Sequence, residues 1–469
     1  MLLYTILKYE LRLLAADRTL AVVVLLLSLS VGYGVSNGFA WTEFQRRTLA
    51  TAAREEAGRF QELKSRLAAP GSRGVPADQF GSTLGTRFAG LPPGPLAALV
   101  IGQSDILPYV TSITTTDHPS LVNDVEIENP THLLTGRFDL GFVVVTLYPL
   151  VILALSYNSL SADKESGTLA QLLSQPVTLR TLLLGKVAAR GLVVIGIAVA
   201  ISVGGVLLTA GVPSGEKLVR LLLWLALVAI YGAFWFTLAT LVNALGWSSA
   251  TNALTLAGSW LLLVAVVPAI ANVVVRSTHP MPSRVELTLA LRTASDRAHA
   301  TGPRLSSRFL EAHPELVKGA AEADEFAVQS LAVQEATEQG ITEILEDFER
   351  QLSRQQSLVD RFRFVSPSIA TLEGLQDVAG VGSARYRLYL SQVASFHDHR
   401  RDYFRPRILR KEPIEANDLD DLPAFAFEEE SLGSVAGRVG TALIGLTLPT
   451  LVLAVMSRSV LRRYRIAGY

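Results

Sequence analysis

One pair of histidines, His397 and His399, is spaced in a way that resembles a metal site. Two ligands at positions i and i+2 suit a strand, in which alternate side chains point the same way, better than the helix that we expect over these residues. We therefore interpret His397-Asp398-His399 as part of a solvated helix face. His397 and His399 are retained only as weak metal candidates.

The sequence contains none of the short motifs that carry hydrolytic or nucleotide chemistry. Gly185-Lys186 is not a phosphate-binding loop, because Arg180 stands where the first glycine should be and Val187 where the hydroxyl should be. No His-Glu-x-x-His zinc motif and no Gly-x-Ser-x-Gly elbow occurs. We expect a chain that is not an enzyme and that holds no cofactor of its own.

A short polar stretch, Ser161–Lys186, lies between two apolar runs and is called the charged segment below. It has an acidic first turn, a Gly-Thr-Leu-x-x-Leu-Leu core and a proline stop. This pattern predicts a short amphipathic helix at a membrane surface.

Long apolar runs determine the expected fold class. Leu221 to Val275 contains no Asp, Glu, Lys or Arg, whereas one helical span needs about 20 residues. A soluble chain with this many apolar helices would have too little polar surface to cover them. The first run follows Asp17-Arg18 without a cleavage context, which argues against a signal peptide. We predict an α-helical integral membrane protein with six transmembrane helices, at 19–41, 139–160, 187–212, 218–245, 252–275 and 436–457.

Basic residues near the spans predict the topology. They cluster in an amphipathic N-terminal helix at 1–18, around the charged segment at 161–186, and in a tail at 458–469. The positive-inside rule assigns all three regions to the cytoplasm. We therefore expect a multi-pass protein of the inner (cytoplasmic) membrane with both termini cytoplasmic. The turn between the fourth and fifth spans carries no basic residue and is uninformative.

Two extracytoplasmic domains follow from this topology, at 42–138 and 276–432. Together they carry a net charge of −8, against +8 for the rest of the chain, so no basic patch indicates nucleic-acid binding. The chain has no cysteine, so both domains must be stabilised by packing.

The first domain is expected to begin as a helix that leaves the membrane and ends at Pro70 and Gly71, with strands between Ala97 and Val125. The larger second domain is expected to be mainly helical, with an arm from Glu315 onward. Core packing explains the apolar stripe of this arm better than a partner-binding groove does. The stripe consists of Ile341, Leu345, Phe348, Leu352, Val359 and Phe362.

The charged segment resembles the coupling region of ABC-2 type transporter permeases, in which such a stretch docks into a separate ATPase subunit. The wider resemblance covers nearly the whole chain, from the amphipathic N-terminal helix through six spans. It implies a partner ATPase dimer that binds ATP and Mg, and a second permease chain, either identical or related. The residues that it assigns to ATPase coupling are Asp163, Glu165, Gly167, Thr168, Leu169, Leu172, Pro176 and Arg180.

The large extracytoplasmic insertions resemble one subgroup of these permeases. The matching stretches are Leu91–Ala97, Gly102–Asp105, Glu128–Pro130, Gly136–Asp139 and Phe364–Pro367. Structural explanations are favoured for two of them: Arg137 and Asp139 would pair at membrane entry, and Asp105 would cap a turn. The alternative is that Arg137 and Asp139 transmit motion between the membrane and the exported domains.

No charged residue lies centrally in a span, which disfavours a pathway for a bare ion or a sugar. The favoured function is export of a lipid-like or amphiphilic substrate by an ATP-driven complex. The alternative is a mechanotransmission complex, in which ATP hydrolysis acts on an extracytoplasmic partner without transport. Membrane lipid is a further expected partner.

Overall fold

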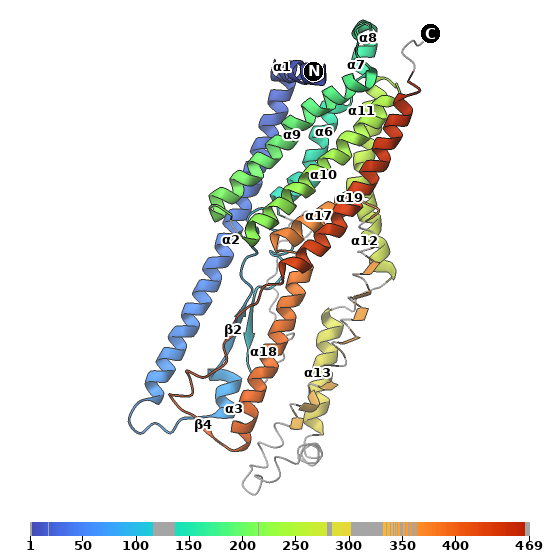
Figure 1. The fold of residues 1–469 in the computed structure, drawn as a ribbon. Helices are drawn as coiled ribbons and strands as arrows, with labels where there is room; N and C mark the ends of the chain where they lie inside the picture. The colour runs from blue at the N-terminus through green and yellow to red at the C-terminus, as the bar shows by residue number, and fades with distance from the viewer. Residues whose placement is uncertain are drawn as a thin grey trace.

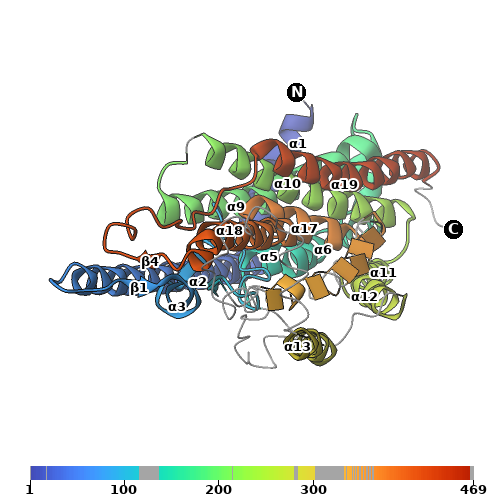
Figure 2. The ribbon, with the colours of Figure 1, turned by 90° about the horizontal axis from the view of Figure 1, so that it is seen from below.

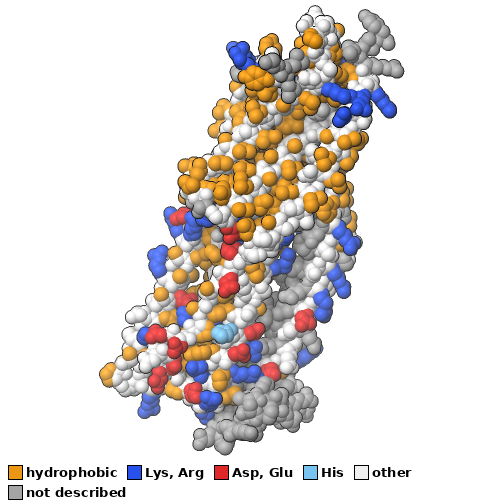
Figure 3. Space-filling view, viewed as in Figure 1, with side chains coloured by type: hydrophobic (Ala, Val, Ile, Leu, Met, Phe, Trp, Pro, Cys, Tyr) orange, Lys and Arg blue, Asp and Glu red, His pale blue; other side chains and the backbone are white. Residues whose placement is uncertain are grey.

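The computed structural model describes residues 2–16, 18–115, 137–213, 215–278, 284–301 and 364–464, with single positions between 332 and 361. Within these residues, six helices are long and apolar enough to cross a membrane, which confirms the prediction of an α-helical membrane protein. They are Ala21–Leu67, Leu140–Glu165, Leu179–Leu208, Glu216–Ala244, Ser249–Thr278 and Leu432–Leu461. Their apolar side chains form a band over the upper half of Figure 3, and most charged side chains lie below it.

The six candidate spans run side by side in one bundle (Figure 1). Helix α1 (Leu2–Ala16) lies across one end of the bundle, where the two chain termini and α8 (Thr168–Leu173) are also found. We call this the terminal end. The other, distal end carries α18 (Ser383–Leu409), α13 (Arg284–Ala300) and the strands.

Helix α2 (Arg18–Leu67) contains the first span and continues far beyond it. Its 50 residues correspond to about 75 Å at 1.5 Å per residue. The helix ends three residues before Pro70, in agreement with the stop expected from Pro70 and Gly71. The first span and the start of the distal region are therefore one continuous element.

Helix α10 (Glu216–Ala244) lies at the centre of the bundle. Trp224, Tyr231 and Trp235 on this helix are fully buried. The surrounding helices are α6 (Tyr148–Ser156), α9 (Leu179–Ala210), α11 (Ser249–Trp260) and α19 (Leu432–Leu461). Apolar packing on all sides is what the uncharged sequence of α10 from Leu221 onward permits.

Two spans contain π-helical turns, which leave some carbonyls without their usual partner. The second span consists of α5 (Leu140–Phe142), η2 (Val143–Leu147) and α6, and the fifth of α11, η3 (Leu261–Val266) and α12 (Val267–Thr278). The Tyr231 hydroxyl donates to the Val145 carbonyl at 2.9 Å, and Trp260 Nε1 donates to the Thr146 carbonyl at 3.1 Å. Side chains thus satisfy backbone groups that lipid could not.

Helix α17 (Pro367–Ala379) departs from the expectation that residues 276–432 lie wholly outside the membrane. It packs between α10 and α19, and Ala370, Leu375 and Val378 belong to the same buried core as the spans. In the view from below, α17 and α18 lie in the middle of the molecule and α13 lies apart (Figure 2). A short helix with a sequence that is not continuously apolar can enter the bundle because protein, not lipid, surrounds it.

The distal region is built from α2, α18 and short strands. Strand β2 (Arg87–Gly90) pairs antiparallel with β3 (Val110–Ile113), and β1 (Val75–Pro76) pairs with β4 (Pro413–Ile414). Helix α3 (Ala77–Gln79) and η1 (Phe80–Leu84) pack Phe80 against Phe404 of α18. Of the 97–125 stretch expected to supply strands, the structure describes residues 97–115, and β3 lies within them. The apolar stripe from Ile341 to Phe362 and the match at Glu128–Pro130 lie outside the described residues.

Candidate functional site

The charged segment forms two short helices, not the single helix that we expected. Helix α7 (Ser161–Glu165) and α8 are separated by Gly167, whose φ of 73° lies in the left-handed region that glycine tolerates best. Helix α9 then begins at Leu179, after Pro176, and Thr178 caps it by accepting from the Thr181 amide. Arg180 therefore belongs to the long helix α9 and not to the surface turn.

Helix α7 is attached to the turn between α10 and α11. Lys164 Nζ donates to the Gly246 carbonyl at 2.9 Å. The Glu165 carboxylate accepts from the Ser249 amide at 2.7 Å and from the Ser249 hydroxyl at 2.8 Å. A carboxylate in this position caps the N-terminus of α11. The charged segment and the α10–α11 turn thus form one unit.

Two asparagines stabilise the break between α6 and α7. Asn243 donates to the Ser156 carbonyl at 2.9 Å and accepts from the Leu160 amide at 3.1 Å, and Asn252 donates to the Tyr157 carbonyl at 3.2 Å. These two asparagines are not among the site residues predicted from the sequence. Their signal was the presence of amide side chains next to apolar spans, where buried polar groups need partners.

Lys186 connects three elements at the terminal end. Its Nζ lies 2.5 Å from Asp163 Oδ2 on α7 and 3.9 Å from Glu10 Oε1 on α1. The side chain of Lys186 is buried, so these carboxylates compensate a charge that would be costly alone. Asp163 is therefore a partner of Lys186 within the chain.

The residues assigned to coupling divide into exposed and buried sets. Leu169 is only 2% exposed, so it packs inside this chain and is not available to a partner. The other set is exposed at the tip of the terminal end, beside exposed Trp247 of the α10–α11 turn. It consists of Glu165, Gly167, Thr168, Leu172 and Pro176.

At the distal end, the membrane-entry residues make different contacts from those expected. Arg137 pairs with Asp105 at 3.3 Å and lies over the Trp41 ring at 4.3 Å, so the expected Arg137–Asp139 pair is wrong. Asp139 instead caps α5 by accepting from the Phe142 amide at 2.7 Å, and it accepts from Ile101 at 2.9 Å and Gly102 at 3.3 Å. Burial raises the pKa of the Asp139 carboxyl above its ordinary value, although these amides oppose the shift.

The loop from Leu91 to Asp105 inserts between the spans. Leu96, Leu99 and Val100 are buried in the main core. A Cβ on Gly94 would lie 2.4 Å from the Ala379 carbonyl oxygen and 2.5 Å from that of Gly380, so only glycine fits there. The loop, Asp139 and the α17–α18 junction together form what we call the distal cluster. Three of the five stretches matching the permease subgroup contribute described residues to it: Leu91–Ala97, Gly102–Asp105 and Gly136–Asp139.

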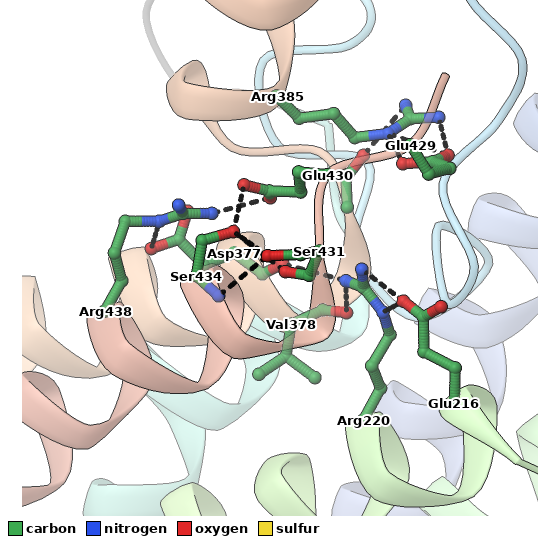
Figure 4. A network of polar contacts seen from close by, with 11 residues as sticks. Glu216, Arg220, Asp377, Val378, Arg385, Glu429, Glu430, Ser431, Ser434 and Arg438 are labelled. Atoms are coloured by element: carbon green, nitrogen blue, oxygen red, sulfur yellow. Dashed lines mark hydrogen bonds and ion pairs between the residues drawn. The ribbon is translucent and has the colours of Figure 1, made fainter. Parts of the chain in front are cut away.

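Three arginines meet at the C-terminal end of α17 (Figure 4). Arg220 of α10 donates to the Val378 carbonyl at 3.2 Å and pairs with Glu216, Arg438 of α19 pairs with Asp377 at 3.3 Å, and Arg385 of α18 donates to the Gly380 carbonyl at 3.2 Å. Cations at a helix C-terminus are favourable. Two further acids, Glu429 and Glu430, pair with Arg385 and Arg438. These contacts attach α17 to two spans and to the distal region.

The weak metal candidates do not converge. Both lie on α18, but the His397 side chain is 2% exposed and His399 is exposed to solvent. The expected solvated face is therefore wrong for His397. Within the part of the chain that the structure describes, no group of three or more His, Asp or Glu residues could hold a metal ion.

The comparisons with known proteins concern the distal region. A family model described as a domain of unknown function (DUF3526) matches residues 284–428, which include α13, α17, α18 and β4. No curated protein matches the chain.

Proposed function

We propose that the chain is the membrane subunit of an ATP-driven complex of the ABC-2 type, with α7 and α8 as the contact for a separate ATPase dimer. The observation that carries the proposal is the exposed tip formed by α8 at the end of the bundle where both termini lie. This end would face the cytoplasm in the inner membrane, because exposed basic residues flank the spans there, among them Arg18, Arg458 and Arg462.

The tip has the properties that a coupling contact needs. Leu172 and Trp247, 38% and 44% exposed, offer apolar area. The hydrogen bonds of Lys164 and Glu165 connect α7, which follows the second span, to the turn between α10 and α11. A push on α8 would therefore reach both α6 and α11. ATP and Mg would bind to the partner ATPase, and two permease chains, identical or related, would match its two subunits.

Export of a lipid-like or amphiphilic substrate is the favoured activity. The outward faces of several spans are broadly apolar; Leu254, Ile270 and Leu448 are examples of exposed side chains. Such faces would suit a lateral route between the membrane and a second permease chain.

Mechanotransmission is the second candidate, and the continuous helix α2 favours it. A single helix of 50 residues runs from the terminal end to the tip of the distal region, so movement at one end would tilt the other. The distal region would then act on an extracytoplasmic partner.

The ATPase contact can be tested with Leu172→Asp. A charge at this exposed position should leave the fold intact. The ATPase should then no longer co-purify with the chain from native membranes, and the purified sample should no longer hydrolyse ATP. Leu84→Asp, equally exposed at the distal end, is the matched control and should retain both. Leu169→Asp is unsuitable because it would bury a charge. Normal ATPase recovery with Leu172→Asp, or equal loss with Leu84→Asp, would exclude α8 as the specific contact.

The two activities can be separated by a deletion that spares α17. Removing residues 284–363 with a short Gly/Ser bridge would leave the buried helix and its hydrogen bonds from Ser366 and Ser368 to the Leu263 carbonyl. Transmission predicts that ATPase binding persists while biological output is lost. Retained output would favour export.

A further inference from the structure

The exposed face of α1 combines two cations with apolar side chains. An open groove of about 340 Å³ along this helix is lined by Tyr4, Leu7, Lys8, Leu11 and Arg12. Lys8 and Arg12 are one helical turn apart, so their charges lie on the same side. Neither forms an ion pair with another residue that the structure describes.

The opposite face holds α1 in place. Leu14 is buried in the main core, and Gly185 of α9 lies so close that a Cβ there would come within 2.4 Å of the Ile6 side chain. Glu10, the one acidic residue of α1, is also buried and lies toward Lys186. The exposed face therefore carries positive charge without a nearby acid on its own helix.

The occupant that fits this face is an acidic phospholipid. Helix α1 lies across the terminal end of the apolar band, where the headgroups of a bilayer around the spans would be found. A phosphate or other anionic headgroup complements Lys8 and Arg12, and Leu7 and Leu11 offer apolar contact to the upper part of an acyl chain.

We infer that α1 binds the headgroup of an acidic membrane phospholipid, and that Lys186 communicates this binding to α7. Lys186 contacts carboxylates on both elements, Glu10 of α1 and Asp163 of α7. A change in the position of α1 would therefore move Glu10 relative to Lys186, and the buried charge of Lys186 also holds Asp163 of α7. The binding itself is independent of the proposed function; its regulatory meaning rests on α7 and α8 being the ATPase contact.

Binding is measured on the delipidated full chain in neutral detergent, by native mass spectrometry during titration with phosphatidylglycerol or phosphatidylcholine. The unmodified chain should bind phosphatidylglycerol preferentially, and excess inorganic phosphate should not displace it. Lys8→Gln with Arg12→Gln should weaken binding about 25-fold, since each cation contributes a factor of about five. The matched control is Lys217→Gln with Arg276→Gln, which removes two exposed cations at the distal edge of the spans and should have little effect.

Equal binding of the two lipids, or equal weakening by both double variants, would overturn the site on α1. Displacement by inorganic phosphate would also overturn it, because it would show a free-anion site. Thermal unfolding of each variant shows whether the fold is retained. None of these measurements involves an ATPase, so they fail or succeed independently of the proposed function.

Communication is measured with a fluorescent label on Gln171→Cys, which is exposed on α8 in a chain without other cysteines. Phosphatidylglycerol should change the label signal in the otherwise unmodified chain. Glu10→Gln should keep lipid binding but lose at least half of the signal change. An unchanged response in Glu10→Gln, or no response in any variant, would refute the role of the Glu10–Lys186–Asp163 connection.

Discussion

The charged segment and the distal cluster lie at opposite ends of the spans and are stabilised in different ways. In the charged segment, hydrogen bonds such as those of Glu165 and Lys164 hold an exposed tip. In the distal cluster, the backbone at Gly94 packs directly against the backbone at the end of α17, and carboxylates and arginines are buried. Substitutions at the tip can therefore test function alone, whereas substitutions in the distal cluster test structure first.

The largest effect should come from filling the space at Gly94. Gly94→Ala would force the Leu91–Asp105 loop away from α17, because the atoms in the way are backbone carbonyls. We expect a loss of about 3 kcal/mol, the upper part of the usual range for overpacking, seen as a lower unfolding temperature in detergent. Gly196→Ala is the control, since nothing lies within 4 Å of a Cβ there. Similar unfolding temperatures for both variants would show that the loop is not tightly held.

An intermediate effect is expected at Asp139. Asp139→Ala would leave three backbone amides without their acceptor, at a cost of about 2 kcal/mol. Asp139→Asn should cost about half as much, because one oxygen remains and because burial already disfavours the charged carboxylate. Chemical unfolding measures the free energy of unfolding of the two variants. A larger loss of stability for Asp139→Asn than for Asp139→Ala would contradict the capping role.

The smallest structural effect is expected for Glu165→Gln, in the exposed tip of the charged segment. The amide keeps one acceptor for the Ser249 amide or hydroxyl and loses only the charge at the α11 N-terminus. The unfolding temperature of this variant should change less than that of Asp139→Asn. Its stimulation of ATP hydrolysis by the partner ATPase should fall clearly. A decrease in unfolding temperature as large as that of Asp139→Ala would contradict this prediction, because it would show that the role of Glu165 is mainly structural.

The two ends also differ in how well the sequence predicted them. The charged segment joins two candidate spans, but its first five residues and the stretch from Leu179 onward belong to the helices of those spans. Between them, the left-handed Gly167 divides the segment, and Leu169 faces inward. The stretches that make up most of the distal cluster were recognised singly, yet nothing in the sequence indicated that Arg137 would pair with Asp105 or that Gly94 would meet the end of α17. Contacts between residues so far apart in the sequence leave no local pattern.

The sequence by itself determined the six apolar helices and the long continuation of α2. An uncharged run in lipid has to satisfy its backbone hydrogen bonds internally, and a helix does so wherever the run is long enough. Only the tertiary structure decided that α17 enters the bundle. Its 13 residues are too few and too mixed to span lipid, and they are stable there because Leu263 accepts from two serines and three arginines meet its C-terminal end. Such a position depends on partners that neighbouring helices supply, so it follows from the assembled fold and not from the segment alone.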